Sequence, residues 1–180
     1  DVMYDTLLHA LRLAREKSNI FAELGLEGKG YALLTVHRAE NTANPDVLEK
    51  IVAYVNEATA GEEVILPMHP RLRKIYKDLK RGFSRHVKII EPVGYFDLLT
   101  LLAGARLLFT DSGGMQKEAF WLKIPCVTLR EETEWVETVA SGWNILYGDY
   151  RGFHQPRVGE VNAYGAGHAA EKIIDILFKG

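Results

Sequence analysis

Short apolar runs alternate along this chain with segments in which apolar residues recur every three or four positions. The runs of strand length are residues 31–36, 64–66, 87–90, 106–110, 125–129 and 143–147. The segments of helical periodicity are residues 5–24, 45–55, 71–80, 95–103, 114–122 and 169–178. The strand-length runs are apolar at most positions, which is typical of strands buried on both faces. The alternation therefore predicts a parallel sheet with helices on both faces.

Six such strands predict one Rossmann-like, doubly wound α/β domain that spans residues 1–180. The expected strand order is 3-2-1-4-5-6, in which the first and fourth strands are neighbours where the order reverses. We expect residues 37–42 and 130–135 to be charged or polar loops at strand ends. Residues 148–167 have no clear pattern of either kind.

The polar residues with chemical potential gather where the predicted strands end. Sheets of this class bind ligands beyond the carboxyl ends of their strands, next to the reversal of strand order. The segments that follow the first and fourth strands should therefore face one crevice. The candidate residues at these strand ends are His37, Arg38, Glu40, Asn41, His69, Ser112, Gly113, Gly114 and Arg130.

An anion-binding turn is the main chemical prediction. The fourth strand leads through Ser112, Gly113 and Gly114 directly into a helix. Free backbone N–H groups and the positive end of the helix dipole coincide at such a turn, which suits a phosphate. A histidine (His37) and arginines on the opposite side favour a diphosphate. Glu118, further along the helix, lies within reach of a ribose hydroxyl.

Plainer interpretations of the same residues stay open at this point. The turn at Ser112 is also compatible with a capped strand–helix connection that is followed by a surface glutamate. His37 is compatible with a strand-end histidine bonded to a neighbouring loop. His69 lies between two prolines, where a structural role is common, and Tyr95 is compatible with a packing role.

Composition narrows the class of protein. The chain has 47% hydrophobic and 26% charged residues, as an ordinary globular domain does. Its net charge of -2 argues against a nucleic-acid-binding surface. No apolar run approaches the roughly 18 residues of a membrane span, so we expect no membrane partner and a cytoplasmic location. The single Cys126 excludes an internal disulfide, and the sequence contains no P-loop, paired-histidine metal motif or Gly-x-Gly-x-x-Gly fingerprint.

Several of these segments resemble, in order and in spacing, those of the UDP-N-acetylglucosamine 2-epimerases. The resemblance covers most of residues 1–150. The matching segments are Thr-Val-His-Arg-Ala-Glu-Asn at 35–41, Leu-Pro-Met-His-Pro at 66–70, Glu-Pro-x-x-Tyr at 91–95, Thr-Asp-Ser-Gly-Gly-x-Gln-x-Glu-Ala at 110–119, Leu-Arg-x-x-Thr-Glu at 129–134 and Gly-Trp-Asn at 142–144.

The family has two Rossmann-like domains in the GT-B arrangement, and this chain resembles the C-terminal, nucleotide-binding one. Because it begins at Asp1 in a helical pattern, we expect a piece of a longer protein whose N-terminal domain lies outside it. The resemblance implies an isomerase that interconverts UDP-N-acetylglucosamine and UDP-N-acetylmannosamine by elimination and re-addition of UDP. It implies no metal and no redox cofactor. The whole protein is expected to be a homodimer, and the separate domain to be inactive.

Position by position, the resemblance assigns His37 to catalysis beside the diphosphate. Ser112, Gly113 and Gly114 match the phosphate-binding turn, and Glu118 matches the ribose-binding carboxylate. The other residues that fall in substrate- or UDP-binding segments are Tyr95 and Leu98 at the uracil, Arg38 and His69 near the substrate and an activator site, and Glu40, Asn41 and Arg130.

The sequence also departs from the family pattern. Trp135-Val136-Glu137 stands where bacterial members have Arg-Pro-Glu, so one arginine that contacts the nucleotide is missing. Three readings remain beside the epimerase half. They are the donor domain of a GT-B UDP-sugar glycosyltransferase, a UDP-binding module without catalysis, and a hydrolysing epimerase.

Overall fold

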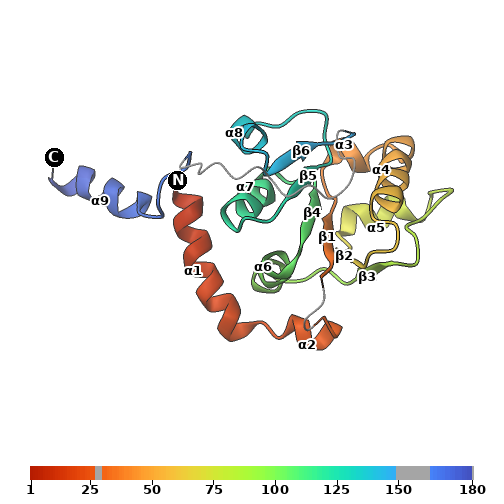
Figure 1. Ribbon diagram of the computed structural model, residues 1–180, viewed down its shortest axis with the longest axis horizontal. Coiled ribbons are helices and arrows are strands. Elements are labelled where there is room, and N and C mark those ends of the chain that lie inside the picture. The colour runs from red at the N-terminus through yellow and green to blue at the C-terminus, as the bar shows by residue number, and fades with distance from the viewer. Residues whose placement is uncertain (27–29, 149–162, 180) are drawn as a thin grey trace.

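Six parallel strands form one sheet in the order β3-β2-β1-β4-β5-β6, which is the predicted order. The computed structural model describes residues 1–26, 30–148 and 163–179 (Figure 1). The strands are β1 (Ala32–Thr35), β2 (Val64–Pro67), β3 (Val87–Ile90), β4 (Leu107–Thr110), β5 (Cys126–Thr128) and β6 (Asn144–Leu146). The helices are α1 (Val2–Lys17), α2 (Ile20–Leu24), α3 (Ala39–Thr42), α4 (Pro45–Ala58), α5 (Pro70–Tyr76), α6 (Tyr95–Gly104), α7 (Gly113–Trp121), α8 (Val136–Ala140) and α9 (Ala169–Lys179).

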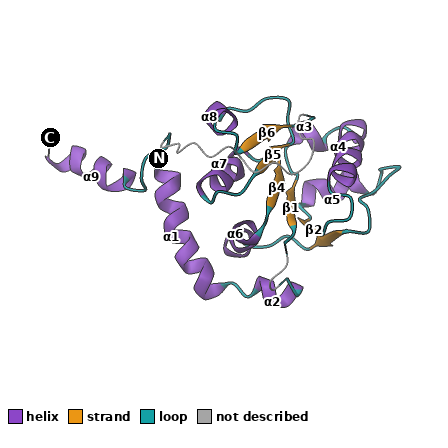
Figure 2. Ribbon diagram, viewed as in Figure 1, coloured by secondary structure: helices purple, strands orange, loops and turns teal. Residues whose placement is uncertain are grey.

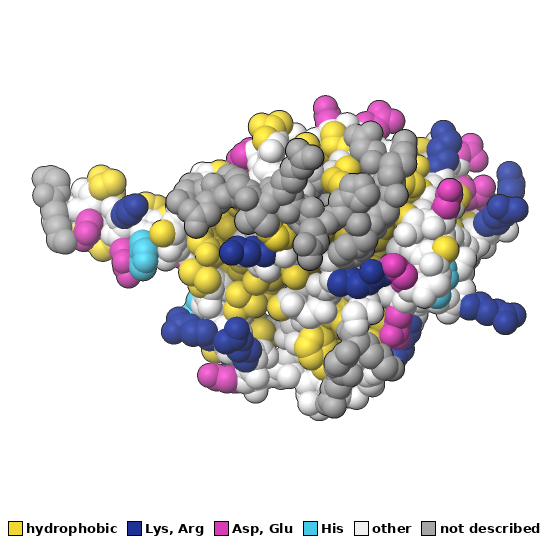
Figure 3. Space-filling view, viewed as in Figure 1, with side chains coloured by type: hydrophobic (Ala, Val, Ile, Leu, Met, Phe, Trp, Pro, Cys, Tyr) yellow, Lys and Arg dark blue, Asp and Glu magenta, His cyan; other side chains and the backbone are white. Residues whose placement is uncertain are grey.

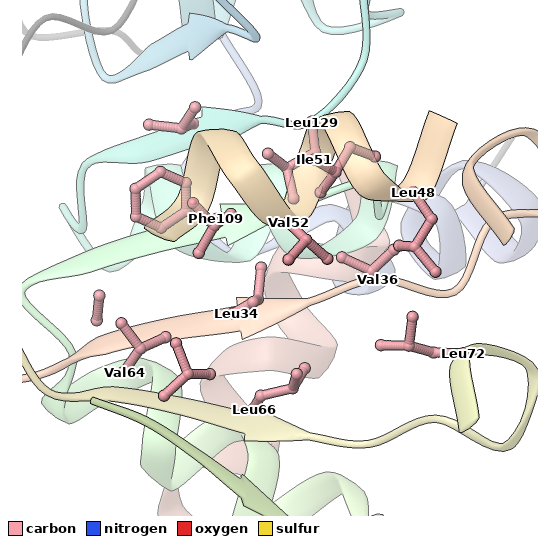
Figure 4. Close-up of a cluster of buried hydrophobic side chains, with 14 of the residues drawn as sticks. Leu34, Val36, Leu48, Ile51, Val52, Val64, Leu66, Leu72, Phe109 and Leu129 are labelled. Atoms are coloured by element: carbon pink, nitrogen blue, oxygen red, sulfur yellow. The ribbon is translucent and has the colours of Figure 1, made fainter. Parts of the chain in front are cut away.

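Helices cover both faces of the sheet, as Figure 2 shows. On one face, Leu34 of β1 and Phe109 of β4 pack against a layer that includes Ile51 and Val52 of α4 (Figure 4). These four side chains are at most 3% exposed. Full burial of one such side chain stabilises a fold by about 1.5–3 kcal/mol, so this layer holds α4 firmly on the sheet.

The opposite face carries a second, separate apolar layer. Leu33 of β1 and Leu108 of β4, the neighbours of the residues above, pack with Leu101 and Leu102 of α6. Successive residues of a strand point to opposite faces, so each central strand must be apolar throughout. This requirement is the reason that the strands could be recognised as continuous apolar runs.

The first helical segment is divided, contrary to the single helix that periodicity predicts for residues 5–24. Ser18 has an extended backbone, with φ -89° and ψ 132°, and separates α1 from α2. Its hydroxyl donates to the Asp97 carboxylate of α6 at 2.7 Å. The hydroxyl of Ser18 therefore bonds to another helix at the point where the helix ends, a tertiary contact that the apolar spacing does not contain.

Short helices replace parts of the predicted loops. The segment 37–42 was expected to be a loop, but Ala39–Thr42 is a single helical turn, in which the Thr42 hydroxyl donates to the Arg38 carbonyl. Val136–Ala140 forms α8 immediately after the predicted loop 130–135. Both helices are too short to produce a recognisable period.

Helix α5 is shorter than the segment 71–80 that was predicted for it. It ends at Tyr76, whose ring stacks on Phe83 with centroids 5.6 Å apart. The Tyr76 hydroxyl also accepts the Phe83 N–H at 3.0 Å. These contacts turn the chain back toward β3 instead of continuing the helix.

Helix α9 occupies the predicted C-terminal segment but leaves its apolar side chains exposed. It projects from the body of the molecule next to α1, and hydrophobic side chains are visible on it (Figures 1 and 3). The Asp5 carboxylate of α1 accepts the Ala169 and Ala170 N–H groups at its start. Its exposed large hydrophobic residues are Ile173, Ile174, Ile176, Leu177 and Phe178.

Two further expectations concern the segment 148–167 and membrane spans. The segment 148–167, which had no clear pattern, lies mostly outside the described residues. Among the described residues, no helix has the length and apolar character that crossing a membrane requires.

Candidate functional site

A cavity of about 410 Å³ opens at the carboxyl ends of β1, β2 and β4. β1 and β4 pair in parallel, with Thr35 opposite Thr110, so the segments that follow them begin side by side. This is the crevice predicted at the reversal of strand order. The candidate residues that line it are His37, His69, Tyr95, Leu98, Ser112, Gly114 and Glu118.

The turn between β4 and α7 is the predicted anion site. Ser112 is the N-cap residue of α7, and its hydroxyl accepts the Met115 N–H at 3.4 Å. Its own N–H donates to the Thr110 hydroxyl at 3.0 Å. Gly113 and Gly114 are the first two helical residues, and the N–H groups at such a position have no partner within the helix. The helix start can therefore donate to a phosphate.

The two glycines of this turn have different surroundings. A Cβ atom at Gly113 would lie 2.4 Å from Glu134 Oε1 and 3.1 Å from Trp135 Nε1. At Gly114 the closest atoms would be 3.8 Å away, which is ordinary contact. Close packing accounts for the glycine at 113, whereas Gly114 lines the cavity and leaves its backbone accessible to a ligand.

The ring of His37 lies next to a buried carboxylate. Its ring Nδ1 lies 3.2 Å from Oδ1 of Asp111, whose side chain is fully buried. The ring of His37 is also 5.5 Å from that of His69, measured between centroids. The two histidines predicted from different strands thus lie side by side in the cavity.

His69 has a structural contact as well as a place in the cavity. It is the N-cap residue of α5, and its Nδ1 accepts the Arg71 N–H at 3.2 Å. Partial burial lowers the pKa of His69, and the neighbouring His37 and Arg71 lower it further. Both effects favour the neutral imidazole, which is the form that can accept this hydrogen bond. The capping role and the cavity role predicted for this residue therefore coexist.

Tyr95 and Glu118 meet at another part of the cavity wall. The Tyr95 hydroxyl donates to Glu118 Oε1 at 2.8 Å, which joins the first turn of α6 to α7. Burial raises the pKa of Glu118, and the hydrogen bond from Tyr95 opposes that rise. Burial, together with the neighbouring Glu118, also raises the pKa of Tyr95. Tyr95 is therefore a hydrogen-bonding partner of Glu118 and not only a packing residue.

The remaining candidate residues belong to a polar network beside the cavity. Arg38 donates to Glu134 at 3.2 Å, and Arg130 donates to the other oxygen of the same carboxylate at 2.7 Å. Glu40 lies 3.9 Å from Arg38 and 3.8 Å from Arg130. Asn41 is buried, and its amide donates to Asp111 and to the Leu129 carbonyl. Three of these residues (Glu40, Asn41 and Arg130) line a separate hollow of about 620 Å³.

Three polar residues that organise this region have no role in the sequence-based assignment. Asp111 connects the two sides of the crevice, and Glu134 pairs with both arginines. Gln116 is buried and accepts hydrogen bonds from Thr133 and Asn144, which attach the loop after β5 and the start of β6 to α7. All three lie in or beside the recognised motifs. One sequence, however, does not reveal which way their side chains turn.

A metal centre has no counterpart in the part of the chain that the structure describes. There, no group of three or more histidine, cysteine, aspartate or glutamate side chains is arranged to hold an ion. The carboxylates around the cavity are instead paired with arginines, with backbone N–H groups or, for Glu118, with the Tyr95 hydroxyl.

Comparison with known proteins identifies the family to which this site belongs. A family model described as UDP-N-acetylglucosamine 2-epimerase matches residues 1–178. A UDP-N-acetylglucosamine 2-epimerase homolog of Methanococcus maripaludis is 44% identical over 98% of this chain. A UDP-2,3-diacetamido-2,3-dideoxy-D-glucuronate 2-epimerase of Pseudomonas aeruginosa is 40% identical over 99% of it. The chain covers 53% and 51% of these two relatives, about half the length of each.

A solved structure agrees with the sequence comparison. The UDP-GlcNAc 2-epimerase of Methanocaldococcus jannaschii, crystallised with UDP-GlcNAc and UDP, superposes with a TM-score of 0.81. It is 36% identical, and the match covers all of this chain and 54% of that one. The Rossmann-like sheet described above is thus the fold of half of such an enzyme. The chain belongs to the UDP-N-acetylglucosamine 2-epimerase family.

Proposed function

We propose that this chain is the C-terminal, UDP-binding half of a UDP-N-acetylglucosamine 2-epimerase, an isomerase. The observation that carries the proposal is the single cavity in which His37, the Ser112 turn and Glu118 come together. An imidazole, a helix start and a carboxylate in one cavity suit a sugar diphosphate nucleoside. Family membership favours a 2-epimerase over the donor domain of a glycosyltransferase.

The diphosphate is proposed to bind at the start of α7. Gly113 and Gly114 offer backbone N–H groups there and Ser112 offers its hydroxyl, and the helix dipole favours negative charge at the same place. When UDP leaves the sugar, negative charge grows on the oxygen that it takes with it. Donors fixed before the reaction stabilise such charge most effectively because they need no reorganisation.

The nucleoside is proposed to extend toward α6. Glu118 is one to two helical turns beyond the phosphate-binding turn, so its free carboxylate oxygen can accept a ribose hydroxyl. Tyr95 holds the other oxygen of Glu118, and the apolar side chain of Leu98 lines the same wall. A ribose on the carboxylate would bring the uracil ring against this wall.

His37 is proposed to act on the leaving group. Its ring lines the cavity together with Ser112, and imidazole can act as a general acid or base. It could therefore protonate or stabilise the departing phosphate oxygen during elimination of UDP. The acid and base that act on carbon 2 of the sugar are assigned to the half of the protein outside this chain.

The partner of this chain is proposed to be an N-terminal Rossmann-like domain of the same protein. The chain has about half the length of its relatives, and α9 presents five exposed large hydrophobic residues. Burial of that surface against another domain would be favourable, because transfer of apolar area from water contributes about 25 cal/mol per Å². A homodimeric whole protein and a cytoplasmic location remain predictions.

The sugar has two candidates. UDP-N-acetylglucosamine follows from the family and from most named relatives, including that of Methanocaldococcus jannaschii. The second candidate is UDP-2,3-diacetamido-2,3-dideoxy-D-glucuronate, because the relative with that name is 40% identical to this chain. Both carry UDP, so the role proposed for the cavity is the same for either sugar.

Calorimetric titration of the chain with UDP tests the proposal. Glu118→Ala should weaken UDP binding by ~1–3 kcal/mol, or roughly 5- to 150-fold, because a charged hydrogen bond to the ribose is lost. Glu57→Ala, which removes an exposed helical carboxylate on α4 that lines neither hollow, is the matched control and should leave the affinity unchanged. Equal affinities of the wild type and Glu118→Ala would contradict the assignment. Neither sugar should be epimerised by this chain alone, and turnover by it would refute the half-enzyme proposal.

A further inference from the structure

Asp111 is a buried carboxylate to which no step of the proposed reaction assigns a role. It follows β4 directly, and its side chain is 0% exposed. A buried carboxylate is unfavourable unless hydrogen bonds or opposite charge compensate for the loss of water. The groups that compensate for it identify what Asp111 does.

Three of these groups belong to the segment that follows β1. The backbone N–H groups of His37 and Arg38 donate to Asp111 at 3.0 and 2.9 Å. The side-chain amide of Asn41 donates at 3.1 Å. One carboxylate from the β4 side therefore sets the path of the whole segment from the end of β1 into α3.

The fourth group is the His37 ring itself. Its Nδ1 lies 3.2 Å from Asp111 Oδ1. An ionised carboxylate presents only lone pairs, so its position at this distance favours the ring forms in which Nδ1 carries a hydrogen. The ring is 38% exposed, and no described residue has a hydrogen bond with Nε2. Nε2 is thus the nitrogen left for a ligand in the cavity.

Accepting the backbone N–H groups of His37 and Arg38 does not require an aspartate at 111, but the contact with the His37 ring distinguishes aspartate from asparagine. An asparagine at 111 could accept both backbone N–H groups through its carbonyl oxygen. It would then present its NH₂ group to the ring, which would require Nδ1 to accept and would move the hydrogen to Nε2. In the neutral ring, aspartate at 111 therefore leaves a lone pair on Nε2 of His37, whereas asparagine would leave a hydrogen there.

We propose that Asp111 is a positioning residue that holds His37 as the Nδ1–H tautomer and directs Nε2 to the leaving phosphate oxygen. The inference rests on the proposed function for the identity of that oxygen, but the contact between Asp111 and His37 is independent of it. With a proton on Nε2 as well, the ring donates that proton to the departing phosphate oxygen and returns to the neutral Nδ1–H form. The carboxylate orients the imidazole and compensates the charge of the protonated ring, as a triad aspartate does. Asp111 itself has no direct contact with substrate in this arrangement.

Long-range ¹H–¹⁵N correlation spectroscopy of the imidazole nitrogens tests the tautomer directly. In the wild-type chain above the pH at which His37 loses its charge, Nδ1 should have the shift of a protonated nitrogen and Nε2 that of an unprotonated one. Asp111→Asn should exchange these two shifts at His37 and leave those of His69 and His86 in place. His37→Gln identifies the signals by their loss.

Two results would overturn the inference. One is a wild-type His37 that is protonated at Nε2, which needs no variant and so does not depend on whether Asp111→Asn folds. The other is a folded Asp111→Asn chain in which the tautomer of His37 is unchanged.

Adding UDP to the wild-type chain separates this inference from the proposed function. UDP should shift His37 Nε2 more than Nδ1. If UDP causes no change in any signal of the chain, the proposed function fails. If UDP binds but the tautomer result is one of the two above, only the role of Asp111 fails.

Discussion

Two buried charges lie on either side of the Ser112 turn, and they are stabilised in opposite ways. Asp111 precedes the turn and is surrounded by N–H donors from the segment after β1. Lys117 follows it on α7, is 2% exposed and pairs with the Asp1 carboxylate. Its ammonium group also lies 4.3 Å from the Trp135 ring and 4.7 Å from the Tyr164 ring, measured to the centroids.

The different surroundings of Asp111 and Lys117 indicate different roles, one in the site and one in holding elements of the fold together. The partners of Asp111 are directional hydrogen bonds that fix the backbone and ring of His37. Aromatic faces attract a cation with little directional demand, and the rings around Lys117 come from segments far apart in sequence. We infer that Asp111 organises the site, whereas Lys117 joins α7 to the start of α1 and to the segment before α9.

Substitutions that remove the charge of Asp111 or of Lys117 should have the largest effects on the free energy of unfolding and should distinguish the two residues most clearly. Asp111→Ala leaves buried N–H donors without an acceptor, so the free energy of unfolding should fall by about 3 kcal/mol or more. Lys117→Met keeps the volume, and the Asp1 carboxylate that loses its partner is 22% exposed, so the fall should be smaller than that of Asp111→Ala. Urea denaturation with comparison of the midpoints at equal m measures both values. Equal losses would contradict the proposed distinction.

The turn between the two charges offers the next test. Gly113→Ala places a methyl group against Glu134 and Trp135, whereas Gly114→Ala meets only ordinary contacts. Gly113→Ala should therefore be less stable than Gly114→Ala by about 1–2 kcal/mol, because both changes gain the same helix propensity and only one creates a clash. The matched pair removes the propensity effect, and equal stability of the two variants would show that Glu134 and Trp135 simply move aside.

The smallest effect concerns the Tyr95–Glu118 pair at the nucleoside end. Burial raises the pKa of Glu118, and the Tyr95 hydroxyl opposes the rise by stabilising the carboxylate. Tyr95→Phe should raise the pKa of Glu118 further. UDP affinity, which is proposed to need the ionised carboxylate, should fall as the pH decreases through this pKa, and in Tyr95→Phe that fall should begin at higher pH. Carboxyl ¹³C titration and calorimetry from neutral to acidic pH measure the two quantities, and identical midpoints would exclude the coupling.

Much of this architecture could be predicted because it depends on local pattern. Continuous apolar runs marked the six strands, and their alternation with helices predicted the order of the sheet, which the structure confirms. The position of the crevice followed from that order, since β1 and β4 are neighbours. Of the residues assigned to the site by motif, His37, His69, Tyr95, Leu98, Ser112, Gly114 and Glu118 line the cavity, whereas Arg38, Glu40, Asn41, Gly113 and Arg130 do not.

The parts that could not be predicted depend on contacts between distant residues. Ser18 ends α1 through a hydrogen bond with Asp97, which is 79 residues away. Asp111 bonds back to a segment more than 70 residues earlier in the chain, so a motif read along the sequence gives it no partner. Helix α9 had a correct apolar period, but the period does not say that its face lacks cover within the described chain.

The central claim is that the Ser112 turn binds the diphosphate of UDP, and a ¹H–¹⁵N titration of the chain with UDP tests it most directly. The amide signals of Gly113 and Gly114 should move saturably, followed by those near Glu118 and His37, while the signals of α9 should stay in place. UDP added to about 1 mM, well above the Kd of a useful nucleotide site, is sufficient. Unchanged signals at Gly113 and Gly114 under those conditions would contradict the account.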